Sequence, residues 1–111
     1  MKKINFNVEL TDAFGQVVKE KRRSDDAEAY PVMLDVSVVN ILGHPASVPE
    51  GTTLTPMEVL DRLTLQQKVA SKTEQEYSPK ELVLIQEAAI TLFNKKMLGL
   101  DLAGTIIKMT E

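Results

Sequence analysis

The chain contains no cysteine, no tryptophan and a single histidine among its 111 residues. The absence of cysteine excludes disulfides, thiolate metal ligands and cysteine nucleophiles. With three Phe and two Tyr, the core must consist mainly of Leu, Val, Ile and Met. The lone histidine, His44, stands in the turn sequence Gly43-His44-Pro45 without a visible acid–base partner. We therefore interpret it as a loop histidine and not as a catalytic one.

Long hydrophobic runs and a strong excess of one charge are also absent. No stretch approaches the ~18 apolar residues that a membrane-spanning helix needs. Asn5, Asn7 and Glu9 interrupt any apolar core of a signal peptide near the start of the chain. A net charge of −3 gives no general attraction to nucleic acid or to anionic lipid. The sequence predicts a soluble cytoplasmic protein with no membrane partner.

Sequence motifs for catalysis are lacking as well. The chain has no G-x-S-x-G elbow, P-loop, H-E-x-x-H helix or G-x-G-x-x-G turn. The adjacent carboxylates Asp25 and Asp26 lie in a charged window, where little desolvation would separate their pKa values. Asp61 and Arg62 allow two interpretations, a polar site or the solvated face of a helix, and we favour the second. We expect no enzyme activity, no cofactor and no small-molecule substrate.

The clearest positive feature is an apolar periodicity over residues 78–98, which predicts a long central helix. Ser78 and Glu81 have the spacing of a capping box, and Pro79 occupies the first helical position, where its missing N–H costs nothing. Gly99 is expected to end the helix in a left-handed conformation. The face that we expect to be buried consists of Leu82, Ile85, Ala89, Leu92 and Phe93.

The same start signal occurs earlier, at Thr55, Pro56 and Glu58. It predicts a second helix that runs to about Ser71. Its buried stripe is expected to contain Met57, Leu60 and Leu63, with Val69 or Ala70. The polar residues 72–77 then link this helix to the one at 78–98, and helices joined by a short link tend to pack antiparallel.

The N-terminal part shows strand periodicity. Apolar residues alternate with polar ones over residues 4–10, which is typical of a half-buried strand. Residues 11–15 have turn chemistry, since Gly15 can take a positive φ and Asp12 can cap the turn. Residues 16–18 would return as a short second strand. We therefore predict a β-hairpin over residues 1–20.

The window 19–28 is the most charged part of the chain, with no net charge. Its basic residues are Lys19, Lys21, Arg22 and Arg23, and its acidic residues are Glu20, Asp25, Asp26 and Glu28. The basic cluster is a candidate for phosphate contact, and Asp25, Asp26 and Glu28 are candidates for a hard-cation site. We favour a solvated loop whose charges screen one another.

Two segments fit either a helix or a strand. Residues 34–42 alternate in hydrophobicity like a strand, yet their apolar residues also have helical spacing up to Gly43. Residues 102–109 have helical spacing too, although Gly104 and the run 105–107 are compatible with a strand. The two prolines and the glycine of residues 45–51 predict an exposed connector between helices.

The order of features from Leu34 onward resembles that of a group of small proteins encoded by tailed bacteriophages and prophages. In that group a short strand region precedes an L-x-D-V-x-V-N-x-L-like helix, an R-x-x-L-x-x-K helix and an acidic-capped E-[IL]-x-L-I helix. The counterparts here are LDVSVVNIL at 34–42, RLTLQQK at 62–68 and ELVLI at 81–85. The resemblance covers about two-thirds of the chain and favours a helix for residues 34–42. The group has no assigned activity, so no site residues follow from it.

Together these observations predict one α+β domain over residues 1–111: a hairpin (1–20), a charged loop with an extended segment (21–33) and a part with three to four helices (34–111). The resemblance implies a phage or prophage protein in the cytoplasm of a bacterial host or on a virion. We expect it to act by binding a protein partner or by self-association. The predicted protein-binding surface comprises the hairpin edge and the connector, with Val48, Pro49 and Leu54. The alternative is a small nucleic-acid-binding regulator that uses Lys19, Lys21, Arg22 and Arg23.

Overall fold

The computed structural model describes residues 1–21 and 28–111. The described elements, in chain order, are β1 (Lys2–Ile4), β2 (Lys19–Glu20), β3 (Tyr30–Pro31), α1 (Leu34–Gly43), the 3₁₀ turn η1 (Pro45–Ser47), α2 (Pro56–Val69), β4 (Gln75–Tyr77), α3 (Pro79–Asn94) and α4 (Leu100–Thr110). Small antiparallel strand pairs beside four helices make this an α+β fold, which confirms the predicted fold class.

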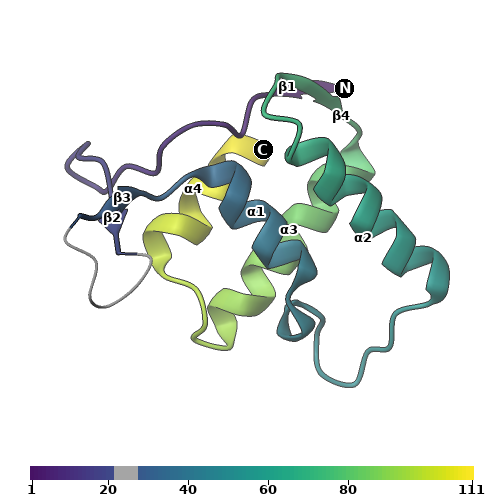
Figure 1. Ribbon diagram of the computed structural model, residues 1–111. Coiled ribbons are helices and arrows are strands. Elements are labelled where there is room, and N and C mark those ends of the chain that lie inside the picture. The colour runs from purple at the N-terminus through teal and green to yellow at the C-terminus, as the bar shows by residue number, and fades with distance from the viewer. Residues whose placement is uncertain (22–27) are drawn as a thin grey trace.

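The helices form the body of the molecule, with α2 on one flank and α4 on the other (Figure 1). α3 packs against α4, α1 and η1, whereas α2 packs mainly against α1. Val38, Ile85 and Ile106 are completely buried where α1, α3 and α4 meet. The helix at the predicted centre of the fold is therefore α3. The expected antiparallel packing of α2 on α3 is replaced by packing of α2 on α1.

The first strand pairs with a segment far away in the sequence. β1 is antiparallel to β4, with Lys2 opposite Tyr77 and Ile4 opposite Gln75. The ring of Phe6, just beyond β1, meets the ring of Tyr77 edge-on at a centroid distance of 5.4 Å. The polar link of residues 72–77 thus contains a strand, and Lys2 also reaches the carbonyl oxygen of Glu111. The predicted strand over residues 4–10 is wrong in its bounds: the strand is Lys2–Ile4, and beyond it Glu9 forms only an isolated bridge to Met33. Alternation also does not identify the partner that a strand pairs with.

The predicted hairpin turn is present. Gly15 has φ +79°, and the Asp12 carboxylate accepts hydrogen bonds from the backbone N–H groups of Phe14 (2.9 Å) and Gln16 (3.0 Å). The two strands predicted on either side of this turn, residues 4–10 and 16–18, pair over a short distance only. Thr11 lies opposite Val17, and the N–H of Val18 donates to the carbonyl of Leu10.

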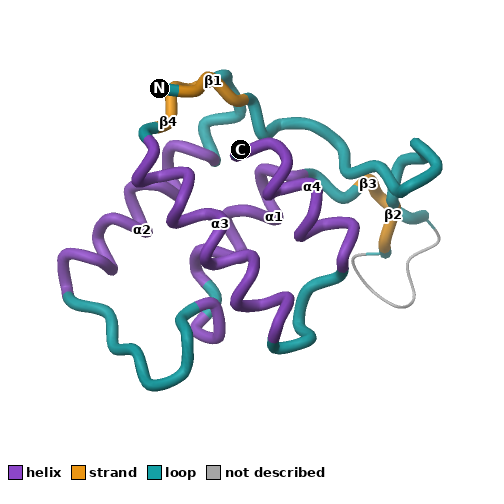
Figure 2. The backbone as a smooth tube through the Cα atoms, turned by 180° about the vertical axis from the view of Figure 1, so that it is seen from behind, coloured by secondary structure: helices purple, strands orange, loops and turns teal. Residues whose placement is uncertain are grey.

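The segment around Val32 then pairs with both sides of the hairpin through backbone hydrogen bonds. The N–H of Leu10 donates to Val32, and the N–H of Val32 donates to Val18, at 2.8 and 2.9 Å. β2 and β3 extend this pairing, and Figure 2 shows both at the end of the molecule away from β1 and β4. The predicted open hairpin edge is therefore partly occupied by the chain itself.

Both predicted capping boxes are confirmed. The Thr55 hydroxyl accepts from the N–H of Glu58, and the Ser78 hydroxyl accepts from the N–H of Glu81, both at 3.2 Å. In return, the two glutamate carboxylates accept from the N–H of Thr55 at 3.0 Å and of Ser78 at 2.9 Å. These bonds satisfy N–H groups that have no partner within the helix.

The end of the central helix differs from the prediction. α3 ends at Asn94, and Lys96 takes the left-handed conformation with φ +61°. Gly99 is instead the N-cap of α4, which shows that residues 102–109 are helical. Ile85, Ala89 and Leu92 are buried as predicted, but Leu82 is half-buried and Phe93 is 36% exposed. Phe93 lies in the last turn of α3 beside the buried Leu92, on a side of the helix that is open to solvent.

Candidate protein-binding surface

The most exposed apolar surface on a helix of the described chain lies on α2. Met57, Val59, Leu60 and Leu63 are 66%, 53%, 56% and 47% exposed, and we call these four side chains the α2 outer face. The sequence predicted Met57, Leu60 and Leu63 as a buried stripe, which is wrong. Single exposed apolar residues are common on protein surfaces, but a contiguous group on one helix makes this face a candidate binding surface.

Charge is absent within the arc of α2 that contains the α2 outer face. At about 100° per residue, the exposed residues of α2 within an arc of about 160° are Pro56, Met57, Val59, Leu60, Leu63, Thr64 and Gln67. None of these side chains carries a charge. The four charged residues of α2, which are Glu58, Asp61, Arg62 and Lys68, lie outside this arc, and Lys68 lies nearest to it, about 20° beyond Met57. The solvent side of α2 therefore has the composition of an interface centre, from which charged residues are depleted.

The opposite side of α2 faces α1, and its buried residues are Arg62, Leu65 and Val69. Carbonyls near the end of α1 explain this choice: that of Leu42 has no partner within its own helix, and that of Val39 can accept a second hydrogen bond. Arg62 donates through Nη1 to the carbonyl of Leu42 at 3.1 Å, and Gln66 donates to the carbonyl of Val39 at 2.7 Å. Polar residues on α2 are thus drawn inward, and apolar residues on the other side are left in solvent.

The sequence analysis placed Arg62 on the solvated face of a helix. The structure shows instead that Arg62 is a buried structural residue. Its side chain is 9% exposed, and Nη1 also donates to Ser47 Oγ at 2.7 Å. Burial lowers the pKa of its guanidinium, while the nearby Glu58 and Glu87 carboxylates act in the opposite direction. Its Nε is buried without an acceptor among the described residues. Arg62 therefore joins the end of α1, η1 and α2.

The connector is held more firmly than the sequence indicated. Its first half is η1, where Ser47 is 1% exposed and hydrogen-bonded to Arg62. Lys95, at the end of α3, donates to the carbonyls of Ala46 at 2.9 Å and of Val48 at 3.0 Å. A connector with these anchors has a defined shape before any partner binds.

Two of the three predicted binding residues lie beside α2. Val48 and Leu54 are half-buried and line a groove of about 310 Å³ together with Val59 and Leu63 of the α2 outer face. Pro49 is exposed and is not among the residues that line this groove. The structure thus brings two connector residues together with α2 residues that the sequence analysis had assigned to the core.

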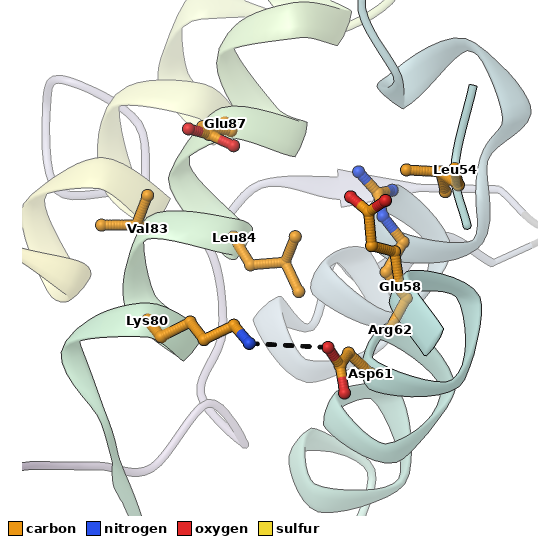
Figure 3. A pocket seen from close by; sticks show the side chains of 8 residues that line it. All are labelled: Leu54, Glu58, Asp61, Arg62, Lys80, Val83, Leu84 and Glu87. Atoms are coloured by element: carbon orange, nitrogen blue, oxygen red, sulfur yellow. Dashed lines mark ion pairs between the residues drawn. The ribbon is translucent and has the colours of Figure 1, made fainter. Parts of the chain in front are cut away.

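A second groove, of about 310 Å³, lies between α2 and α3. We call it the acidic groove, and its lining residues are Leu54, Glu58, Asp61, Arg62, Lys80, Val83, Leu84 and Glu87 (Figure 3). Lys80 reaches across it from α3 to Asp61 on α2, at 3.7 Å. Because the Lys80 side chain is 86% exposed, this ion pair contributes little to stability.

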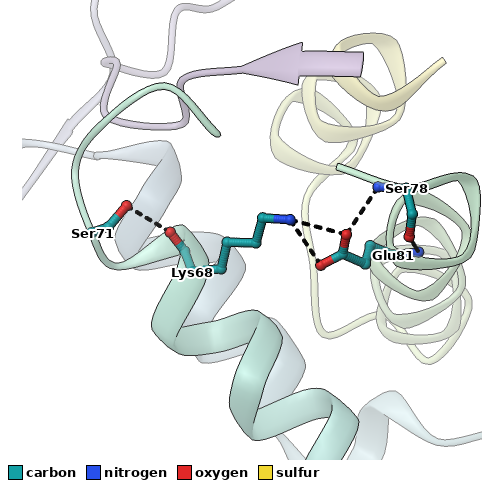
Figure 4. A network of polar contacts seen from close by, with 4 residues as sticks. All are labelled: Lys68, Ser71, Ser78 and Glu81. Carbon is teal, nitrogen blue, oxygen red and sulfur yellow. Dashed lines mark hydrogen bonds and ion pairs between the residues drawn. The ribbon is translucent and has the colours of Figure 1, made fainter. Parts of the chain in front are cut away.

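The ends of the acidic groove's two helices are tied by a tighter network (Figure 4). Lys68 of α2 forms an ion pair with Glu81 of the α3 capping box at 3.0 Å and lies 4.7 Å from the centre of the Tyr77 ring. Burial and the Glu81 charge raise the pKa of Tyr77 to about 12. Burial raises the pKa of Glu81, but the N–H of Ser78 and the Lys68 ammonium outweigh it, so this pKa lies below its ordinary value.

The other candidate residues lie apart from α2. Lys19 and Lys21 flank Glu20 on an exposed strand end, whereas Arg22, Arg23, Asp25 and Asp26 lie outside the described residues. Glu28 is exposed. In the part of the chain that is described, no group of three or more His, Asp or Glu residues has the arrangement of a metal site. His44 caps η1, because its Nδ1 accepts from the N–H of Ala46 at 3.0 Å.

No helix within residues 1–21 and 28–111 has the length and hydrophobicity to span a membrane. No family model, curated protein or solved structure matches this chain.

Proposed function

We propose that this chain is a non-enzymatic protein-binding domain and that it binds a second copy of itself through the α2 outer face. The observation that carries the proposal is the exposure of Met57, Val59, Leu60 and Leu63 on one uncharged side of a helix. Moving such a surface from water into a protein interface is favourable, at about 25 cal/mol per Å² of apolar area.

A second copy fits this surface because an uncharged face meets itself without repulsion between like charges. In a two-fold symmetric dimer the same residues lie on both sides of the interface. An axis that crosses α2 between Leu60 and Leu63 would place two α2 helices antiparallel, with each Leu60 against Leu63 of the other copy. Antiparallel helices also have favourably oriented dipoles. The groove of Val48 and Leu54 lies at the border of this interface and can receive side chains from the other copy.

The resemblance described above gives this proposal its setting. Within it, the chain acts in the cytoplasm of a bacterial host or on a virion, as an assembly accessory or a modulator of a host factor. Both roles require stoichiometric binding and no chemical step.

The experiment is sedimentation velocity over about 10 μM to about 1 mM protein, the range in which interfaces of modest area associate. We expect the wild-type chain to sediment increasingly as a dimer. Leu60→Glu combined with Leu63→Glu should weaken association at least about tenfold, because it places unpaired charges at the centre of the interface. A wild-type chain that stays monomeric throughout would refute the proposal.

Val36→Glu is the matched control. Val36 is 53% exposed on α1 and Leu60 is 56% exposed on α2, so Val36→Glu adds the same single charge at similar exposure as Leu60→Glu alone, which should also weaken association. Val36→Glu should associate like the wild type. Equal weakening by Val36→Glu would indicate a general effect of charge and not an interface on α2.

A further inference from the structure

We infer that the acidic groove between α2 and α3 binds a lysine- or arginine-bearing amphipathic segment of a partner protein. This inference goes beyond the proposed self-association, because the groove lies on the charged side of α2 and not on its uncharged outer face. Three features of the groove carry it: an apolar floor, three carboxylates of which only Asp61 is in an ion pair, and a buried donor that lacks an acceptor.

The floor of the groove exists because its two helices pack on different neighbours. α2 packs mainly on α1, whereas α3 packs on α4 and η1 as well as on α1. Leu54 and Leu84 are half-buried there, and Val83 is 48% exposed. In Figure 3, Leu84 points from α3 into the space between the helices, toward Asp61 and Glu58 on α2. An apolar side chain of a partner helix could rest on this floor, as in other helix-in-groove complexes.

The charges around the floor select a cation. Glu58, Asp61 and Glu87 contribute three carboxylates, and within the described chain no cation lies at ion-pair distance from Glu58 or Glu87. Lys80 forms a long ion pair with Asp61 through a highly exposed side chain, which a ligand can displace. The Arg62 guanidinium is buried and already donates to Leu42 and Ser47. The accessible charge is therefore negative, and it complements a lysine or arginine side chain.

Arg62 gives the second, independent indication of a ligand. Its side chain is 9% exposed and lines the groove, yet its Nε has no acceptor in the described part of the chain. A buried donor without an acceptor is uncommon and costly. A peptide backbone carbonyl in the groove would supply this acceptor once the side chains that cover Nε move aside. A protein segment offers such a carbonyl, a basic side chain and an apolar side chain together.

The test uses a synthetic amphipathic peptide of leucine and lysine, and the same peptide with every lysine replaced by glutamate. Binding is followed by NMR of the ¹⁵N- and methyl-labelled chain at a concentration below the association range. We expect the lysine peptide to shift the signals of Val83, Leu84 and Leu54, and added salt to weaken its binding. The glutamate peptide should leave these signals unchanged.

The decisive comparison is between two variants that each remove two negative charges. Asp61→Asn with Glu87→Gln should weaken binding of the lysine peptide by roughly three- to tenfold, as expected for two exposed ion pairs. Glu74→Gln with Glu76→Gln removes exposed carboxylates near β4 and should have little effect. Glu58 is left in place because it belongs to the α2 capping box.

The inference is wrong if the lysine peptide does not bind, if it shifts signals elsewhere, or if both variants weaken it equally through the general acidity of the chain. These results leave self-association untouched, since sedimentation measures that separately. Conversely, if the chain remains monomeric but binds the lysine peptide at Val83 and Leu84, the result would support the acidic groove as a binding site and would refute the proposed dimer.

Discussion

α2 and α3 begin in the same way and end in different environments. Each starts with a hydroxyl cap, a proline and a glutamate that close a capping box, Thr55-Pro56-Met57-Glu58 and Ser78-Pro79-Lys80-Glu81. Yet α3 buries Ile85, Ala88, Ala89 and Leu92 against several neighbours, while α2 buries Arg62, Leu65 and Val69 mainly against α1.

This difference separates two kinds of information in a helical sequence. Caps are local, because the bonds join residues three apart, so both starts follow from the sequence. Which side of a helix is buried depends on the neighbour that it meets. In α3 the apolar side is the buried side, whereas in α2 polar groups at the end of α1 attract Arg62 and Gln66 inward. Apolar residues left outside on α2 are then available for a partner.

The largest expected contrast between the two helices is in core truncation. Ile85→Ala in α3 should lower the free energy of unfolding by roughly 2–5 kcal/mol, because Ile85 is completely buried. Leu60→Ala in α2 should change it by less than about 1 kcal/mol in the monomer, because Leu60 is 56% exposed. Urea denaturation at low protein concentration measures both. Equal losses would mean that the outer side of α2 is packed in the monomer.

The next effect tests the inward side of α2. Arg62→Met should lower the free energy of unfolding by roughly 2–3 kcal/mol, because it leaves the carbonyl of Leu42 and the hydroxyl of Ser47 without their shared donor. Gln67→Met is a suitable control, since Gln67 is exposed on the same helix and should tolerate the change. A neutral Arg62→Met would contradict the structural role assigned to Arg62.

Removing either cap should lower the free energy of unfolding by a similar amount, because the capping bonds are local and do not depend on the neighbours of the helix. Thr55→Ala and Ser78→Ala should each lower the free energy of unfolding by about 1 kcal/mol, because each removes the oxygen that accepts from the third helical N–H. Chemical denaturation of both variants, compared with Thr53→Ala in the exposed loop before α2, measures this. A loss confined to one helix would show that one cap contributes nothing.

The smallest effect is one of pH at the start of α3. The pKa of Glu81 lies below its ordinary value of 4.5 in the folded chain. A carboxyl with a lowered folded pKa stabilises the fold fully above its unfolded pKa, and this contribution is lost as the pH falls through the folded pKa. Glu81→Gln should therefore lower stability by a few tenths of a kcal/mol near pH 7. The difference in the free energy of unfolding between Glu81→Gln and the wild type should shrink below about pH 4. A difference that does not depend on pH would contradict the stabilising role of the Glu81 carboxylate.

Much of the secondary structure could be predicted from the sequence. The starts of α2 and α3 and the Asp12–Gly15 turn rest on chemistry between near neighbours in the chain. The α+β class followed from period-two alternation before residue 11 and helical spacing after residue 54. Residues 34–42 and 102–109 fit two structures, because short apolar runs satisfy both periods.

The partners of these elements could not be predicted. The pairing of β1 with β4 joins residues more than seventy positions apart, and nothing in Gln75, Glu76 and Tyr77 identifies Lys2–Ile4 as their partner. The α2 outer face was missed for the same reason. One signal was available: α2 has two apolar sides, one with Leu65 and Val69 and one with Leu60 and Leu63, and a single neighbour covers only one of them.

The absence of cysteine makes a direct measurement of the proposed interface possible. Thr64→Cys introduces one thiol beside Leu60 and Leu63 on the solvent side of α2, and a spin label attached there reports distances between copies. Lys108→Cys on the exposed side of α4 serves as the reference position. Packed helix axes lie about 8–10 Å apart, so labels on two facing α2 helices should lie within about 20 Å of each other. We expect this short intermolecular distance for Thr64→Cys and a longer one for Lys108→Cys. Distances at Thr64→Cys that are no shorter than those at Lys108→Cys, or no intermolecular signal at all, would contradict it.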